Sequence, residues 1–132
     1  MKQPEIVAWT ARDIVKLLRF GVSGVMATAV HAMVAMMLIV KAEAAPMLAN
    51  VLAFLCATGV SYLMNTLWSF SAPVDVRNAW RFAVVSALGL GMTALVSGGV
   101  QLAGGAPWSG IAAVACVVPP ATFLVHRAWT YR

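Results

Sequence analysis

The sequence predicts an all-α membrane protein with four transmembrane helices, built as two parallel repeats of a helical hairpin. The first observation is composition: 62% of the 132 residues are hydrophobic and mean hydropathy is +0.88, which is too apolar for a soluble domain of this size. The second is that four runs of about 18–22 residues are nearly free of charge, long enough for an α-helix to cross a hydrocarbon core of about 30 Å. The third is an internal repeat.

Each repeat begins with Arg-Phe and ends in a short motif with two aromatic residues. The Arg-Phe pair at 19–20 recurs 62 positions later at 81–82, and the segment NTLWSF at 65–70 recurs 61 positions later as HRAWTY at 126–131. Because each unit contains two spans, both units begin and end on the same side of the membrane. The repeats are therefore expected to be parallel, related by a pseudo-two-fold axis along the membrane normal.

The elements are expected in one domain over residues 1–132. In residues 1–19, Val7, Ala11, Ile14 and Leu18 recur at helical spacing, which predicts an amphipathic helix on the cytoplasmic surface. Charges are absent from the four runs that follow, and a charge in mid-bilayer is costly. The four spans are expected at about 20–40, 46–67, 82–103 and 108–125.

The basic residues set the orientation of these spans. Lys41 is alone at one end of the spans, and the other eight basic residues fall at the opposite end. These eight are Lys2, Arg12, Lys16, Arg19, Arg77, Arg81, Arg127 and Arg132. The positive-inside rule places that end, with both termini, in the cytoplasm. Since the basic residues flank spans and form no soluble basic face, no nucleic-acid partner is expected.

Small residues recur every fourth position in two of the spans. One stripe runs from Ala53 through Ala57 and Ser61 to Asn65, and another comprises 83, 87 and 91. Such stripes allow transmembrane helices to approach closely, so both are expected to face a neighbouring helix.

Arg19, Arg81 and Arg127 are all expected at the cytoplasmic membrane boundary, with Asn65 and His126 at corresponding positions of the repeat. Guanidinium groups bind phosphate through paired hydrogen bonds and keep their charge, so a cluster at headgroup depth suits a lipid phosphate. The alternative is that each arginine extends to the interface and only sets topology.

His31 is the only ionisable side chain deep inside a predicted span. It is a candidate polar site that relays a proton, or a neutral histidine hydrogen-bonded within the bundle. No acidic residue falls inside a span, and the sequence contains no hydrolytic or nucleotide-binding motif, so an enzyme is not expected. Cys56 and Cys116 lack the spacing of a metal site, and no metal or other cofactor is expected.

These segments resemble the GtrA family of small bacterial membrane proteins, from about residue 19 to residue 132. The matching stretches are RFGVSG at 19–24, SYLMNTLWSF at 61–70, RFAVVS at 81–86 and HRAWTY at 126–131. His126 stands where the second half of the family often has asparagine. The resemblance implies a multi-pass protein of the bacterial cytoplasmic membrane. It also implies a flippase that moves polyprenyl-phosphate-linked monosaccharides, such as undecaprenyl-phosphate glucose, to the outer leaflet for cell-envelope glycan synthesis.

On this reading, the three arginines bind the phosphate, Asn65 and His126 bind the phosphate or sugar hydroxyls, and Trp68 and Trp129 contact the sugar ring or the interface. Four short helices leave little room for a headgroup path, so a homodimer is expected. One alternative is a membrane scaffold for a glycosyltransferase. Another is a small multidrug-type exporter, but the sequence has no acidic residue in the first span, where such exporters carry a glutamate.

Overall fold

The computed structural model describes residues 9–132, except for the side chains at positions 46, 47 and 107. Its helices are α1 (Ala11–Lys41), α2 (Pro46–Met64), η1 (Asn65–Ser69), α3 (Val76–Leu102), α4 (Pro107–Val125) and η2 (His126–Thr130). No strand occurs in this part of the chain. Four stretches are long and apolar enough to cross a membrane, namely Ala11–Lys41, Leu48–Ser69, Val76–Leu102 and Trp108–Thr130. The predicted all-α, four-span fold is confirmed.

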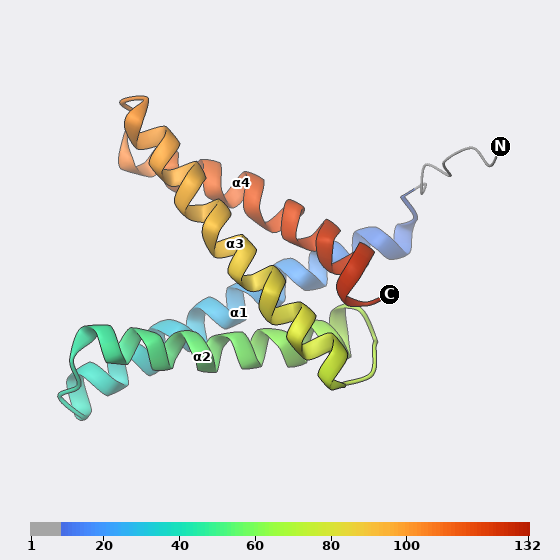
Figure 1. The fold of residues 1–132 in the computed structure, drawn as a ribbon, viewed down its shortest axis with the longest axis horizontal. Helices are drawn as coiled ribbons and strands as arrows, with labels where there is room; N and C mark the ends of the chain where they lie inside the picture. Colours follow the sequence, from blue (N-terminus) through green and yellow to red (C-terminus); the bar gives the residue numbers. More distant parts are fainter. Residues whose placement is uncertain (1–8) are drawn as a thin grey trace.

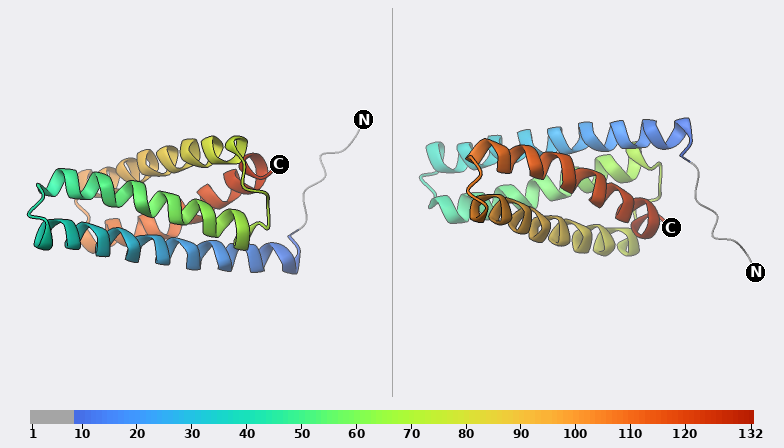
Figure 2. Two further views of the ribbon diagram at one scale, coloured as in Figure 1. Left: turned by 90° about the horizontal axis from the view of Figure 1, so that it is seen from below. Right: turned by 90° about the horizontal axis from the view of Figure 1, so that it is seen from above.

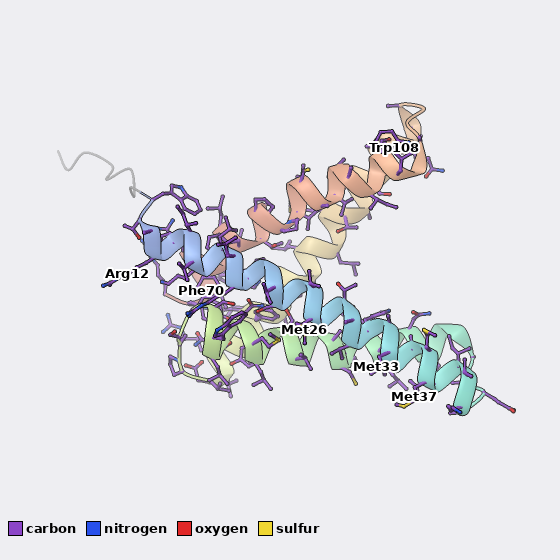
Figure 3. All side chains as sticks on the ribbon, turned by 180° about the vertical axis from the view of Figure 1, so that it is seen from behind. Arg12, Met26, Met33, Met37, Phe70 and Trp108 are labelled. Atoms are coloured by element: carbon purple, nitrogen blue, oxygen red, sulfur yellow. The ribbon has the colours of Figure 1, made fainter. Side chains whose placement is uncertain are left out.

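The helices form two hairpins that meet at one end and diverge toward the other (Figure 1). α1 packs along α2 and α3 packs along α4, whereas the two hairpins contact each other less. The start of α1, the α2–α3 connection and the end of η2 lie together where the hairpins meet (Figure 2). The basic residues gather here, so this is the end that the positive-inside rule predicts to be cytoplasmic. At the other end, Met37 of α1 and Trp108 of α4 lie on separate arms (Figure 3).

α1 is one continuous helix, with no break at residue 19. It begins with a capping box, in which the Thr10 hydroxyl accepts from the Asp13 N–H and the Asp13 carboxylate accepts from the Thr10 N–H at 2.9 Å. Residues 11–19 of the expected amphipathic segment are thus the first turns of α1, while residues 1–8 lie outside the described part. α3 likewise begins before the expected residue 82, because Asp75 caps it by accepting from the Asn78 N–H at 2.7 Å.

α2 and α4 both end in a single π-helical turn, at corresponding positions of the repeat. The Phe70 N–H donates to the Asn65 carbonyl at 2.8 Å, and the Tyr131 N–H donates to the His126 carbonyl at 3.1 Å. π turns are rare and are frequent at functional sites. Their recurrence here shows that the duplication extends to the local backbone.

Aromatic side chains join the hairpins at the cytoplasmic end. Phe70 and Tyr131, which correspond in the two repeats, stack with ring centroids 4.4 Å apart. Phe123 is fully buried, and its ring lies 5.6 Å from the rings of both Phe20 and Phe70. The best-packed part of the molecule is therefore the membrane boundary, where the candidate residues also lie.

The two small-residue stripes behave differently. In the first stripe, Ala53 and Ala57 of α2 and Asn65 of η1 are buried, as expected, and Ser61 is half-buried. In α3, the stripe at 83, 87 and 91 is exposed, so the expectation that it packs against a neighbouring helix of this chain is wrong. The close approach of α3 to α4 occurs at Gly89 instead, because a Cβ at this position would lie 3.1 Å from Thr122 Cγ2 of α4.

Candidate functional site

Each repeat holds its first arginine against the tryptophan of its closing motif. Arg19 Nη1 donates to the Trp68 carbonyl at 3.0 Å, and its guanidinium carbon lies 5.4 Å from the centroid of the Trp68 ring. Arg81 Nη1 donates to the Trp129 carbonyl at 2.7 Å, and its guanidinium carbon lies 5.3 Å from the centroid of the Trp129 ring. Both carbonyls belong to π turns at helix C-termini, where unpaired carbonyls and the helix dipole favour a cation.

The two pairs differ in their surroundings. Arg81 also lies 6.0 Å from the ring of Trp80, which itself packs edge-on against Trp129 at 5.3 Å. The Arg81 Nε is buried and has no hydrogen-bond partner within the described residues. Arg19 is half-buried and lines an open cavity. Both side chains are half-buried, but Arg81 lies against two tryptophan rings with its Nε buried, while Arg19 lies against one ring and lines a cavity.

The third candidate arginine is paired with an acid. Arg127 Nη2 lies 3.1 Å from a carboxylate oxygen of Asp13, and its guanidinium carbon is 5.1 Å from the Trp9 ring centroid. This ion pair ties the first turn of α1 to η2. The three arginines thus have three different sets of partners, and the cavity that Arg19 lines is not lined by Arg81 or Arg127.

Asn65 is buried within a network of polar side chains. Its Nδ2 donates to the Ser61 carbonyl at 2.8 Å and to the Ser61 hydroxyl at 3.2 Å, and its Oδ1 accepts from the Ser69 hydroxyl at 3.0 Å. The Ser69 hydroxyl also lies 3.3 Å from that of Ser23 on α1. Asn65 therefore links α2, η1 and α1, and direct contact with a ligand requires these bonds to open.

His126 occupies the corresponding position in the second repeat and is also buried. Its Nδ1 lies 2.9 Å from the Thr130 hydroxyl, and its ring stacks on Phe82 with centroids 4.6 Å apart. Thr130 corresponds to Ser69 in the first repeat. The second repeat thus replaces a hydrogen-bonded amide with an imidazole that combines one hydrogen bond with aromatic packing.

A basic cavity of about 330 Å³ opens beside the first turns of α1. One face of α1 contributes three basic residues to its lining, Arg12, Lys16 and Arg19. The end of η1 contributes Ser69, and the α2–α3 connection contributes Ser71. Ser71 has a φ of 50°, which is uncommon for a residue other than glycine and places backbone strain at the cavity. Figure 3 shows Arg12 extending outward from the start of α1.

The intramembrane histidine lies deeper between α1 and α2. His31 Nε2 is 3.2 Å from Asn50 Oδ1, so the imidazole is held within the hairpin by a hydrogen bond. Within residues 9–132, no group of three or more His, Cys, Asp or Glu side chains is arranged to hold a metal ion.

The comparison with protein families identifies the chain. Residues 19–131 match the family model described as GtrA/DPMS, transmembrane domain. The chain belongs to the GtrA/DPMS transmembrane-domain family. No curated protein and no solved structure matches it.

Two cations of the basic cavity precede the segment that matches the GtrA/DPMS family. Arg12 and Lys16 lie before residue 19, and sequence reasoning assigned them only to topology. The available signal was their spacing, since Arg12, Lys16 and Arg19 stand at positions i, i+4 and i+7 and so share one helical face. Ser69 and Ser71 carried no comparable signal.

Proposed function

We propose that this GtrA/DPMS protein translocates a polyprenyl-phosphate-linked monosaccharide from the cytoplasmic to the outer leaflet of a bacterial cytoplasmic membrane, without catalysing a reaction. Membership of the family supports a role in handling lipid-linked sugars. The basic cavity carries the proposal, because three cations and two serine residues line it at the end expected to be cytoplasmic, the depth of a lipid phosphate.

The residues of the cavity suit a phosphodiester. Arg19 uses Nη1 on the Trp68 carbonyl, and a guanidinium has five N–H donors in all, so further donors remain for phosphate oxygens. Lys16 and Arg12 add mobile charge, while Asp13 is engaged by Arg127. In this proposal the other polar candidates support the two π turns; they are Arg81, Arg127, Asn65 and His126. Trp68 is the aromatic residue nearest the phosphate.

The energetic need for a protein is large. Taking an unpaired hydroxyl into hydrocarbon costs several kcal/mol, so a hexose with four or five hydroxyls faces a barrier of roughly 10–20 kcal/mol before its phosphate is counted. A polar route through the protein lowers this barrier while the prenyl tail stays in lipid. Because no acidic residue falls in the charge-free runs at about 20–40, 46–67, 82–103 and 108–125, we propose downhill movement coupled to use of the sugar outside.

Native mass spectrometry from lipid nanodiscs tests the proposal, with undecaprenyl phosphate as the probe. We expect wild type to retain this lipid and the triple variant Arg12→Gln, Lys16→Gln, Arg19→Gln to lose it. Arg77→Gln is the matched control, because Arg77 is an exposed cytoplasmic cation outside the cavity. Retention by wild type no greater than that of phosphatidylglycerol would refute the proposal.

The alternative function is a scaffold for a membrane glycosyltransferase. The start of α3 favours it, since Val76 is 83% exposed and Trp80 is 50% exposed at the cytoplasmic end. Crosslinking of this surface to a transferase, with no retention of the prenyl lipid, would support the scaffold.

We also propose a homodimer that packs through the exposed stripe at 83, 87 and 91 of α3. A cysteine at Ala87, in a background with Cys56→Ser and Cys116→Ser, should crosslink between copies in native lipid. The control is a cysteine at Val117, on the exposed face of α4. Equal crosslinking at both positions would contradict this interface.

A further inference from the structure

A second cavity, open at the surface of the helices, lies in the membrane-spanning part between α1, α2 and α3. It has a volume of about 260 Å³ and is lined by Thr28 and His31 of α1, by Phe54, Thr58 and Ser61 of α2, and by Ser86 of α3. Thr58 is 11 residues from Ser69, so it lies roughly 16 Å deeper than the basic cavity at the helical rise of about 1.5 Å per residue.

Two of the hydroxyls in this cavity have no hydrogen-bond partner within residues 9–132. Serine and threonine in membrane helices commonly donate to a carbonyl one turn earlier, as Thr28 does to Gly24 at 2.9 Å. For Thr58 and Ser86, no hydrogen bond occurs among the described residues. Polar groups left unpaired in hydrocarbon are costly, and they mark pathways for polar ligands.

The chemistry of the lining restricts the ligand. The lining includes no Asp, Glu, Lys or Arg, so its polar groups are hydroxyls and the His31 imidazole, with no carboxylate, ammonium or guanidinium to balance an ion. Phe54 adds an aromatic surface, which suits the apolar face of a sugar ring. The volume equals that of roughly nine water molecules in the liquid, which leaves room for one monosaccharide.

A buried network connects this cavity to the basic one. Ser69 lines the basic cavity and donates to Asn65, and Asn65 donates to Ser61, which lines the deeper cavity. Hydrogen-bonding groups therefore continue along one face of α2 and η1, from headgroup depth into the membrane.

From these observations we propose that the deeper cavity is a binding site for the neutral sugar of the lipid-linked substrate, occupied after the headgroup leaves the cytoplasmic boundary. This inference rests on the proposed function and deepens it by separating a phosphate site from a sugar site. The hydroxyls of Thr58 and Ser86 bind sugar hydroxyls, and His31, oriented by Asn50, provides a further polar contact.

The test compares two probes in nanodiscs: undecaprenyl phosphate, and a panel of undecaprenyl phosphates linked to glucose, galactose or mannose. The double variant Thr58→Val, Ser86→Ala removes both hydroxyls with little change in volume. We expect the sugar-linked lipid that wild type retains best to bind about 5- to 150-fold more weakly, from the typical contribution of two hydrogen bonds. Retention of the unglycosylated lipid should be unchanged.

Two further variants control for folding. Thr58→Ser, made in the wild-type protein, keeps the hydroxyl and should retain the sugar-linked lipid nearly as well as wild type. Thr93→Val removes a hydroxyl that donates to Gly89 at 2.9 Å, outside the cavity, and should leave both lipids bound as in wild type.

The outcomes separate this inference from the proposed function. If wild type retains the unglycosylated lipid but prefers no sugar-linked form, or if the double variant weakens both lipids equally, the sugar site is refuted and the phosphate proposal stands. Unchanged binding of every lipid by the double variant also refutes the sugar site. If wild type retains neither probe above phosphatidylglycerol, both proposals fail.

Discussion

The paired arginines of the two repeats allow a direct test of which one is structural. Arg81→Gln should destabilise the fold more than Arg19→Gln, although both remove a hydrogen bond to a tryptophan carbonyl. Lipid retention should change in the opposite order, because Arg19 lines the basic cavity and Arg81 does not. The same chemical change is thus predicted to have two different effects at corresponding positions.

The magnitude follows from the contacts. Hydrogen bonds to charged groups contribute about 1.5–3 kcal/mol, and ring contacts about 0.5–1 kcal/mol when exposed and about 2 kcal/mol when desolvated. Arg81 has a 2.7 Å bond and two ring contacts in a partly buried site, partly offset by its unpaired Nε. The Arg19 bond is exposed and therefore screened by solvent, so we expect a loss of about 1–2 kcal/mol for Arg19→Gln and about 2–4 kcal/mol for Arg81→Gln, whose bond is partly buried.

The assay is unfolding in mixed detergent micelles, with helicity and tryptophan fluorescence followed as the fraction of denaturing detergent rises. Arg77→Gln, an exposed change, should alter the free energy of unfolding by less than about 0.5 kcal/mol. Equal destabilisation by Arg19→Gln and Arg81→Gln, or the reverse order, would refute the assignment of Arg81 to structure and Arg19 to binding.

The remaining predictions concern the polar residues of the two motifs. Asn65→Leu should lower the free energy of unfolding by about 1–3 kcal/mol, because the Ser69 hydroxyl loses its acceptor in a buried site; an unchanged unfolding midpoint would contradict this. His126→Asn should be less destabilising than His126→Ala in the same assay, because an amide can still reach Thr130 whereas alanine leaves a cavity. Tyr131 lies beyond η2, and burial raises its pKa from 10.0 to about 12. Its neutral form is favoured in the folded state, so its contribution to stability is complete below pH 10 and falls as pH rises through about 12. Tyr131→Phe should remove this part of the alkaline destabilisation, as seen by comparing its unfolding with that of wild type between pH 9 and pH 12; identical pH profiles would contradict the assignment.

The positions of the spans could be predicted because the membrane imposes a one-dimensional constraint. A charge in hydrocarbon is costly wherever it falls, and each charge-free run lies almost entirely within one of the four long apolar stretches. The repeat could also be recognised from the sequence, because Arg-Phe and the closing motif recur at nearly constant spacing. The helix ends were less predictable, because α1 and α3 begin with caps made by Thr10 and Asp75, outside the apolar runs.

The site was predicted only in part. Arg19, Asn65 and His126 were identified by their place in the repeat, but the sequence did not distinguish a side chain that faces a cavity from one enclosed in protein. Arg127 does not line the basic cavity, because it pairs with Asp13. Asp13 is more than a hundred positions away, and only the folded chain brings the two side chains within 3.1 Å. The exposed stripe on α3 was misassigned for the same reason, because spacing does not say which face of a helix meets a neighbour.

The sequence by itself determined the class of protein, the number of its spans and the duplication, because hydrophobicity and repetition act locally along the chain. The tertiary structure alone decided which cations share a cavity, which carbonyls the π turns present to Arg19 and Arg81, and which hydroxyls remain unpaired between the hairpins. These features depend on the angle and rotation at which helices meet. This angle and rotation are set by many contacts at once, among them the stacking of Phe70 on Tyr131 and the close approach of α3 to α4 at Gly89.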